Sequence, residues 1–226
     1  MKNKEAAEWL MEGQRQKAFL EKMGGAAIIK ERKFQVVVEY VPVSFLPEKE
    51  GEIRKQEDTD QAIRAIEQTN GIENGTITAF VYIKHFLRRK PGQKTAHAIV
   101  SFRKATGANH AIEHGMFIEG KRVWARKHTQ DPQRCYRCQA TDANHTAAQC
   151  TAQEDICGRC GTIADHRTKD CQATNPDNFH CPNCNTRGHG AADRRCPKFL
   201  AAVERVRARR PETQLRYYPT ADPATW

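Results

Sequence analysis

The cysteines and histidines between residues 135 and 196 form the clearest chemical pattern in the sequence. All nine cysteines of the chain lie in this stretch, and the 134 residues before it contain none. They fall into three successive sets with the spacings C-x2-C-x6-H-x4-C, C-x2-C-x5-H-x4-C and C-x2-C-x4-H-x6-C. The predicted ligands are Cys135, Cys138, His145 and Cys150 in the first set, Cys157, Cys160, His166 and Cys171 in the second, and Cys181, Cys184, His189 and Cys196 in the third.

Three thiolates and one imidazole suit a tetrahedral zinc ion, so the pattern predicts three Zn²⁺ per chain. Four protein ligands leave no open position for water, which indicates structural sites that supply folding energy to segments too short for a core. Redox or disulfide use is the alternative, but an odd number of regularly spaced cysteines favours metal. His180 competes with His189 as the third histidine ligand, and the six-residue gaps also allow a shared arrangement.

The side chains around these sets predict contact with single-stranded nucleic acid. Zinc knuckles place an aromatic or apolar side chain on an unpaired base while basic residues meet phosphate. Tyr136 is the predicted stacking residue. The predicted basic contacts are Arg134, Arg137, Arg159 and Arg187. The alternative is that these charges are ordinary solvated groups on an array that binds protein.

The preceding region, residues 34–130, has the pattern of a compact α+β domain. The expected elements are strands at 34–41, 77–86 and 95–102, a last strand or hairpin at 116–126, and helices at 53–68 and 106–114. In the second strand, alternation predicts one shared face for Ile77, Ala79, Val81, Ile83 and His85. The order β-α-β-β-α-β predicts a four-stranded antiparallel sheet with two helices on one face and an open opposite face.

Two strands of this domain are similar to the motifs of an RNA recognition domain. In Thr95–Phe102, Ala98, Val100 and Phe102 fit the longer motif, and His97 is its candidate first aromatic residue. Ile99 and Val37 stand where such domains often have further aromatic residues. The basic residues between the second and third strands (the basic hairpin) compensate for the missing aromatic residues by attracting phosphate. The predicted phosphate contacts there are Arg88, Arg89, Lys90 and Lys94.

The composition of the whole chain sets limits on its function. The 37 Lys and Arg residues outnumber the 27 Asp and Glu residues, which favours a polyanionic partner, RNA or single-stranded DNA. No apolar run is long enough to span a bilayer, and Met1–Leu10 is too polar for a secretory signal, so we expect an intracellular protein of the nucleus, the cytoplasm or both. No catalytic constellation or small-molecule site is evident, so we expect no enzyme. Residues 1–30 are expected to form a helix, 134–200 the knuckles, and 201–226 a C-terminal tail.

A domain similar to an RNA recognition domain, followed directly by three such knuckles, resembles the gag-like first open-reading-frame protein of LINE-type non-LTR retrotransposons, especially those of fungi. The stretches that carry the resemblance are 94–102, 120–127, 134–138, 181–199 and 217–223. The resemblance implies a non-enzymatic protein that coats element RNA in ribonucleoprotein particles and self-associates through upstream helices. A cellular zinc-knuckle factor of RNA processing and a protein-interaction scaffold are the alternatives.

Overall fold

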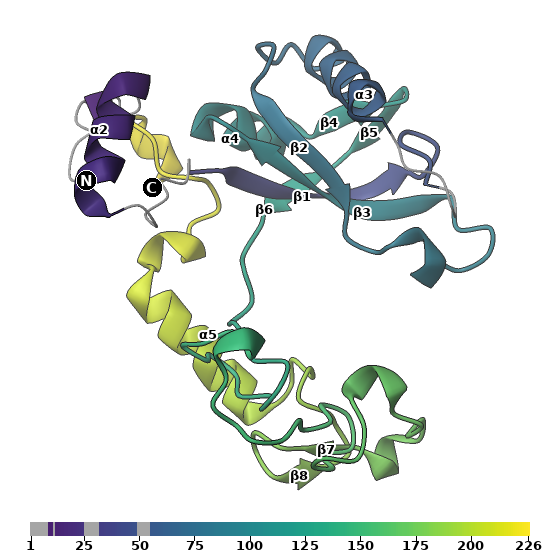
Figure 1. Cartoon of the computed structure of the whole chain (residues 1–226). Coiled ribbons are helices and arrows are strands. Elements are labelled where there is room, and N and C mark those ends of the chain that lie inside the picture. The colour runs from purple at the N-terminus through teal and green to yellow at the C-terminus, as the bar shows by residue number, and fades with distance from the viewer. Residues whose placement is uncertain (1–8, 11, 25–31, 49–54) are drawn as a thin grey trace.

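The computed structural model describes residues 9–10, 12–24, 32–48 and 55–226 of the 226-residue chain. Much of the expected helix 1–30 and the start of the expected helix 53–68 lie outside these residues. Within them, helix α2 (Gly13–Met23) is followed by Gly24, whose φ of 88° ends the helix. Figure 1 shows a sheet unit (residues 34–127) and a knuckle array (residues 134–196), joined by an extended linker and by the last helix, α5.

The sheet unit contains the predicted four-stranded antiparallel sheet. Its strands are β1 (Phe34–Pro42), β2 (Ile77–Tyr82), β3 (Thr95–Phe102) and β6 (Ala125–Lys127), in the order β2-β3-β1-β6. Helix α3 (Gln56–Thr69) joins β1 to β2, and helix α4 (Ala105–His114) follows β3. A separate hairpin of β4 (Met116–Ile118) and β5 (Lys121–Val123) precedes β6, so the predicted last segment supplies both a hairpin and a sheet strand.

Alternating apolar residues place the core between one sheet face and the two helices. Val36 and Val38 of β1 and Val100 of β3 have no exposed surface. Residues of the helices in the same core are Ile63, Ile66, Ala108, Ala111 and Ile112. Full burial of one valine or isoleucine side chain contributes about 1.5–3 kcal/mol. This unit therefore has its own hydrophobic core, unlike the short loops that follow it.

Strand β2 differs from its prediction in both length and alternation. It ends at Tyr82, and the residues that follow form the short 3-10 helix η1 (Phe86–Arg88). A register irregularity between Ile77 and Ala79 shifts the side-chain alternation. As a result Ile77 is buried in the core, whereas Val81 is 59% exposed on the opposite face, and the two do not share a face as predicted.

A bulge near the end of β1 exposes an aromatic residue. The pairing of β1 with β3 shifts between Val38 and Val41, and Tyr40 has a φ of 56°, which is uncommon for an aromatic residue. Tyr40 is 61% exposed, and its ring centroid lies 5.1 Å from that of His97. The helices lie on the other face of the sheet from this pair, because His97 alternates with the buried residues of β3.

The C-terminal segment returns to the sheet unit after the knuckles. Helix α5 (Pro197–Arg209) lies alongside the array (Figure 1). The chain beyond it brings Tyr218 into the core of the sheet unit. The Tyr218 hydroxyl donates to the carbonyl oxygen of Gln35 at 2.6 Å and accepts from its N–H at 3.0 Å. The Asn109 side chain bonds the backbone N–H and carbonyl of Tyr218, both at 2.8 Å. The expected tail, residues 201–226, therefore consists of the second part of helix α5 and a segment that packs on the sheet unit.

The remaining elements are short. The array contains β7 (His180–Cys181), β8 (Thr186–Arg187) and the 3-10 helices η2 (Ala147–Gln149), η3 (Thr168–Asp170) and η4 (Pro176–Asn178), and the C-terminal segment contains η5 (Pro211–Gln214) and η6 (Pro223–Thr225). Among the residues that the structure describes, no helix combines the length and hydropathy needed to cross a bilayer.

Candidate metal centres and nucleic-acid interface

The structure brings together the four predicted ligands of each set. In every set the three sulfur atoms and one imidazole nitrogen lie within 4.8 Å of one another. The first and last cysteines are buried, and the second cysteine and the histidine are partly exposed. The three groups share no ligand, so each set can hold its own ion. This excludes the shared arrangement that the longer gaps allowed.

The distances between ligand atoms fit a tetrahedral zinc ion. Zn–S bonds of about 2.3 Å and Zn–N bonds of about 2.0 Å separate two sulfurs by about 3.8 Å, and a sulfur from a nitrogen by about 3.5 Å. The sulfurs of Cys181 and Cys196 are 3.7 Å apart. The sulfur–Nε2 distances are 3.5 Å for Cys138–His145, 3.4 Å for Cys160–His166 and 3.3 Å for Cys184–His189. All nine cysteines are free thiols, so the disulfide alternative does not apply to this structure.

The three loops share the same backbone conformation. The fourth and seventh residues after the first cysteine have positive φ: Gln139 and Asp142, Gly161 and Ala164, and Asn185 and Gly188. In each loop, the residue just before the first cysteine pairs with the residue six positions after that cysteine. The pairs are Arg134 with Thr141, Ile156 with Ile163, and His180 with Arg187. Each Cys-x2-Cys pair therefore sits in a tight hairpin that turns both sulfurs toward one point.

One cysteine in each set has a pKa below that of an ordinary thiol. Burial opposes ionisation of Cys160, but hydrogen bonds from Thr162 and the neighbouring thiols lower its pKa to about 6. Cys184 has the same arrangement with Thr186, and its pKa is also about 6. Because a metal binds the thiolate, these groups favour the charge state that zinc requires.

The histidine ligands are oriented by their surroundings. In the second set, Asp165 Oδ2 lies 2.7 Å from His166 Nδ1, which leaves Nε2 to face the cysteines. A carboxylate in this position fixes the tautomer of a metal-binding histidine. The question of His180 is settled by its contacts, since its Nε2 lies 2.9 Å from Asn185 Oδ1 and outside the ligand group. His189 completes the third set.

The three loops pack on one another as a single array. The N–H of Ile156 donates to the carbonyl of Arg137, and the N–H of His180 donates to that of Arg159, both at 2.9 Å. The same bond thus links the first loop to the second and the second to the third. Gln139, only 1% exposed, donates to the carbonyls of Tyr136 and Ile156 at 2.9 Å.

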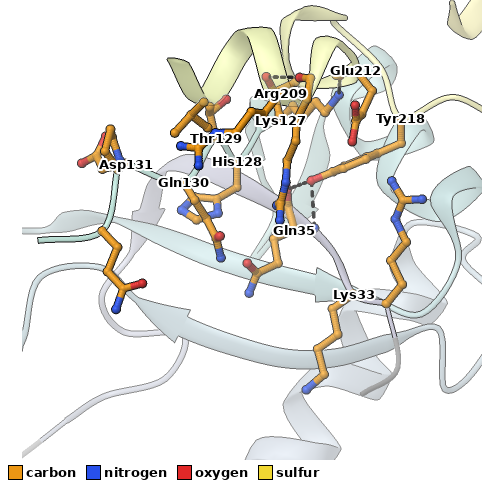
Figure 2. A pocket seen from close by; sticks show the side chains of 16 residues that line it. Lys33, Gln35, Lys127, His128, Thr129, Gln130, Asp131, Arg209, Glu212 and Tyr218 are labelled. Atoms are coloured by element: carbon orange, nitrogen blue, oxygen red, sulfur yellow. Dashed lines mark hydrogen bonds between the residues drawn. The ribbon is translucent and has the colours of Figure 1, made fainter. Parts of the chain in front are cut away.

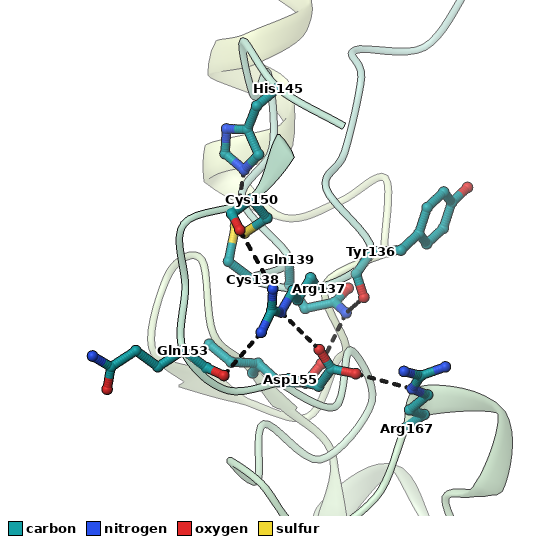
Figure 3. A network of polar contacts seen from close by, with 10 residues as sticks. Tyr136, Arg137, Cys138, Gln139, His145, Cys150, Gln153, Asp155 and Arg167 are labelled. Atoms are coloured by element: carbon teal, nitrogen blue, oxygen red, sulfur yellow. Dashed lines mark hydrogen bonds and ion pairs between the residues drawn. The ribbon is translucent and has the colours of Figure 1, made fainter. Parts of the chain in front are cut away.

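Arg137 and Arg159 brace the loops. Arg137 donates to the carbonyl of Cys150 at 3.4 Å and to the carbonyl of Gln153 at 2.9 Å (Figure 3). Arg159 makes the matching bonds to Cys171 and Ala173, at 3.0 and 3.1 Å. These bonds tie the first and second Cys-x2-Cys turns to the segments that contain their closing cysteines. This revises the expectation that the two side chains serve first as nucleic-acid contacts.

Tyr136 is the most exposed aromatic residue of the knuckle array, at 74%. Its side chain points away from the metal ligands in Figure 3, and the Arg134 guanidinium lies 5.2 Å from its ring centroid. The equivalent positions of the other loops are Gly158 and Pro182, so only the first loop presents a ring here. The predicted contact Arg187 is exposed on β8.

The predicted contacts in the basic hairpin divide into two groups. Three are exposed to solvent: Arg88, Lys90 and Lys94. Arg89 instead lies 2.5 Å from Glu48 and 4.5 Å from the ring centroid of Tyr82, with its side chain only 9% exposed. Arg89 therefore holds the hairpin against the sheet, which corrects its expected role as a phosphate contact.

On the sheet itself, His97 is exposed, but Phe102 has no exposed surface and lies in the core. The expectation that Phe102 contacts nucleic acid is therefore wrong. Sequence reasoning missed the exposed rings of Tyr40 and Trp124. Tyr40 reaches the open face through the bulge, and Trp124 is 56% exposed with the Arg122 guanidinium 4.7 Å from its ring. The basic-aromatic pair of Arg122 and Trp124 was a usable signal in the sequence, whereas the bulge at Tyr40 was not.

The arrangement thus combines closed metal-ligand sets with exposed rings beside arginine side chains. A set of four protein ligands can organise a surface but leaves no coordination position for a reactant. Comparison with protein-family models, with curated proteins and with solved structures gave no match. The ligand sets and the exposed ring of Tyr136 therefore carry the functional assignment.

Proposed function

We propose that this protein binds RNA or other single-stranded nucleic acid through a knuckle array that three zinc ions hold in shape. The array acts as a binding surface and performs no reaction. Its free thiols suit a reducing, intracellular compartment. Zinc supplies the folding energy of loops that have no core of their own.

The observation that carries the proposal is the setting of Tyr136. An aromatic residue with most of its surface in water loses hydrophobic stabilisation unless a partner covers it. Here Tyr136 lies in sequence between two metal ligands, Cys135 and Cys138, and its ring lies beside Arg134. A ring of this kind stacks on an unpaired base, and an adjacent guanidinium meets phosphate.

The sheet unit supports the same function. The strand order β2-β3-β1-β6, with both helices on one face, is the arrangement expected of an RNA-recognition-like domain. Its open face carries His97 and Tyr40 in edge-to-face contact. We assign this face a secondary role, because the paired residues Val37 and Ile99 of its two central strands supply no ring.

At the level of biological role, we propose a gag-like component of a retrotransposon ribonucleoprotein. The support is the residue-level resemblance, in particular the stretches 134–138 and 181–199. Many copies of a coating protein of this kind bind along one RNA, and they show little preference for its sequence. Saturation of a long RNA by many chains is the expected behaviour.

The test is a titration of a labelled single-stranded RNA with zinc-loaded protein and with chelated protein. We expect chelation to abolish binding, because the loops unfold without metal. In the loaded protein, Tyr136→Ala should weaken binding by about 1–3 kcal/mol, the usual value of one base stack. Tyr136→Phe keeps the ring and serves as the matched control.

Binding that survives chelation would move the activity to the sheet unit. Absence of binding in both states would favour a protein-interaction scaffold, in which zinc only stabilises the loops. Equal binding by Tyr136→Ala and Tyr136→Phe would remove the stacking role from this residue.

A further inference from the structure

An open groove lies between the sheet unit and the first two knuckles. Its volume is about 1060 Å³, and its lining residues belong to the knuckle array except for one from the sheet unit. The sheet unit contributes Arg88, from the end of η1. The knuckle side includes Arg134 and Tyr136 of the first loop and Arg167 and Lys169 of the second.

The charge of this groove is strongly positive. Five cationic side chains line it: Arg88, Arg134, Arg137, Arg167 and Lys169. The one acid in the lining, Asp155, lies 3.1 Å from the Nε of Arg137 and 2.9 Å from that of Arg167 (Figure 3). Within the described residues, no carboxylate pairs with Arg88, Arg134 or Lys169. Unpaired cations from two units facing one groove favour a polyanion that spans both.

The groove favours a single strand because Tyr136 is one of its lining residues. Its ring is open to solvent, and a base must be unpaired to lie against it. Phosphates on either side of that base would meet the cations of the same groove. An acidic peptide would satisfy the charges, but it would leave the ring without a flat partner.

The two walls are held in place by contacts of the C-terminal segment. Arg205 and Arg209 of α5 pair with Asp142 of the first loop, at 3.2 and 2.8 Å. At the other end, the Tyr218 hydroxyl is hydrogen-bonded to the backbone of Gln35 in the sheet unit (Figure 2). Lys127 also donates to tail carbonyls, including that of Tyr217 at 3.0 Å. The groove therefore lies between units that are connected twice, by the linker and by this segment.

We propose that one strand of nucleic acid crosses this groove and contacts both units at once, with a base on Tyr136 and a phosphate at Arg88. This inference rests on the proposed function of the knuckle array. It adds that the sheet unit contributes to the same binding site through the β2–β3 connection, and not through its open face alone.

The experiment uses the full zinc-loaded chain and labelled oligouridylates of about 4 and about 12 nucleotides, lengths within the range that one binding unit covers. The variant is Arg88→Ala, with Arg64→Ala as control, because Arg64 is an exposed arginine on helix α3 and does not line the groove. Arg88→Lys tests whether the charge is sufficient. Zinc content and circular dichroism verify that each variant is folded.

We expect Arg88→Ala to weaken binding of the longer strand several-fold and to reduce the slope of log K against log salt by about 0.7, the value for one phosphate contact on a single strand. Arg64→Ala should leave both unchanged, and Arg88→Lys should restore the slope. The shorter strand makes fewer phosphate contacts, so its slope of log K against log salt should be smaller than that of the longer strand.

If Arg88→Ala behaves like Arg64→Ala while Tyr136→Ala still weakens binding, the shared groove is wrong and the proposed function stands. If neither zinc removal nor Tyr136→Ala affects binding, the proposed function itself fails. If polyglutamate displaces the longer strand from the wild type but not from Arg88→Ala, the groove belongs to an acidic protein and the inference is overturned.

Discussion

Replacement of Gly158 by alanine tests whether the three loops pack as one array. A Cβ atom at this position would lie 2.6 Å from Gln139 Oε1, 3.0 Å from its Cδ and 3.1 Å from Thr168 Oγ1. The Gln139 side chain cannot move aside cheaply, because it is buried and donates to two carbonyls. The Thr168 hydroxyl is equally fixed, since it accepts from the N–H of Gly158 at 2.6 Å.

Overpacking at such a point costs about 1–3 kcal/mol. Because metal binding and folding of these loops are coupled, the same free energy weakens zinc retention by about 5- to 140-fold. Competition with a coloured chelator measures this loss in Gly158→Ala. Gly13→Ala is the matched control, as no atom lies within 4 Å of the added Cβ there. Unchanged zinc affinity in Gly158→Ala would refute the packing of the second loop on Gln139.

Two further predictions concern single side chains. Asp165→Asn should weaken zinc retention by the second set about 10- to 100-fold, because the carboxylate orients His166; equal chelator competition curves for variant and wild type would exclude that role. Burial raises the pKa of Tyr82 to about 12, so its neutral hydroxyl contributes stability that is fully present below about pH 10 and is lost as the pH rises toward 12. Denaturant unfolding should therefore show a steeper loss of stability over this range for wild type than for Tyr82→Phe, and parallel curves would contradict the shift.

The metal-ligand sets could be predicted from the sequence because their signal is local. Zinc fixes the number and type of ligands, and the Cys-x2-Cys spacing alone brings two sulfurs together. All twelve predicted ligands fall into the expected groups. The choice between His180 and His189 needed the structure, since both lie close enough in sequence and only the backbone of the β7–β8 hairpin decides which ring faces the sulfurs.

The sheet was predictable for a similar reason. The alternation in residues 95–102 and the β-branched run in 34–41 both indicated strands, and β3 has the predicted bounds. The register shifts in β1 and β2 were not predictable, because each depends on pairing with β3. These shifts turned Tyr40 outward and moved Ile77 into the core.

The roles of the arginines were the least predictable part. Sequence alone does not distinguish the exposed arginines, such as Arg88, from those that bind another part of the protein. The latter are Arg89, Arg137 and Arg159. Arg89 pairs with Glu48, which is 41 residues away in sequence. Arg137 and Arg159 both donate to backbone carbonyl groups, which leave no mark in the sequence, and Arg137 also pairs with Asp155. The return of Tyr218 to the sheet unit is a long-range contact of the same kind.

Native mass spectrometry of the protein with a single-stranded RNA tests the central claim most directly, because it counts metal and RNA in the same particle. The account predicts that RNA-bound chains carry three zinc ions and that chains stripped of zinc carry no RNA. RNA bound to zinc-free chains, or fully zinc-loaded chains that never carry RNA, would contradict it.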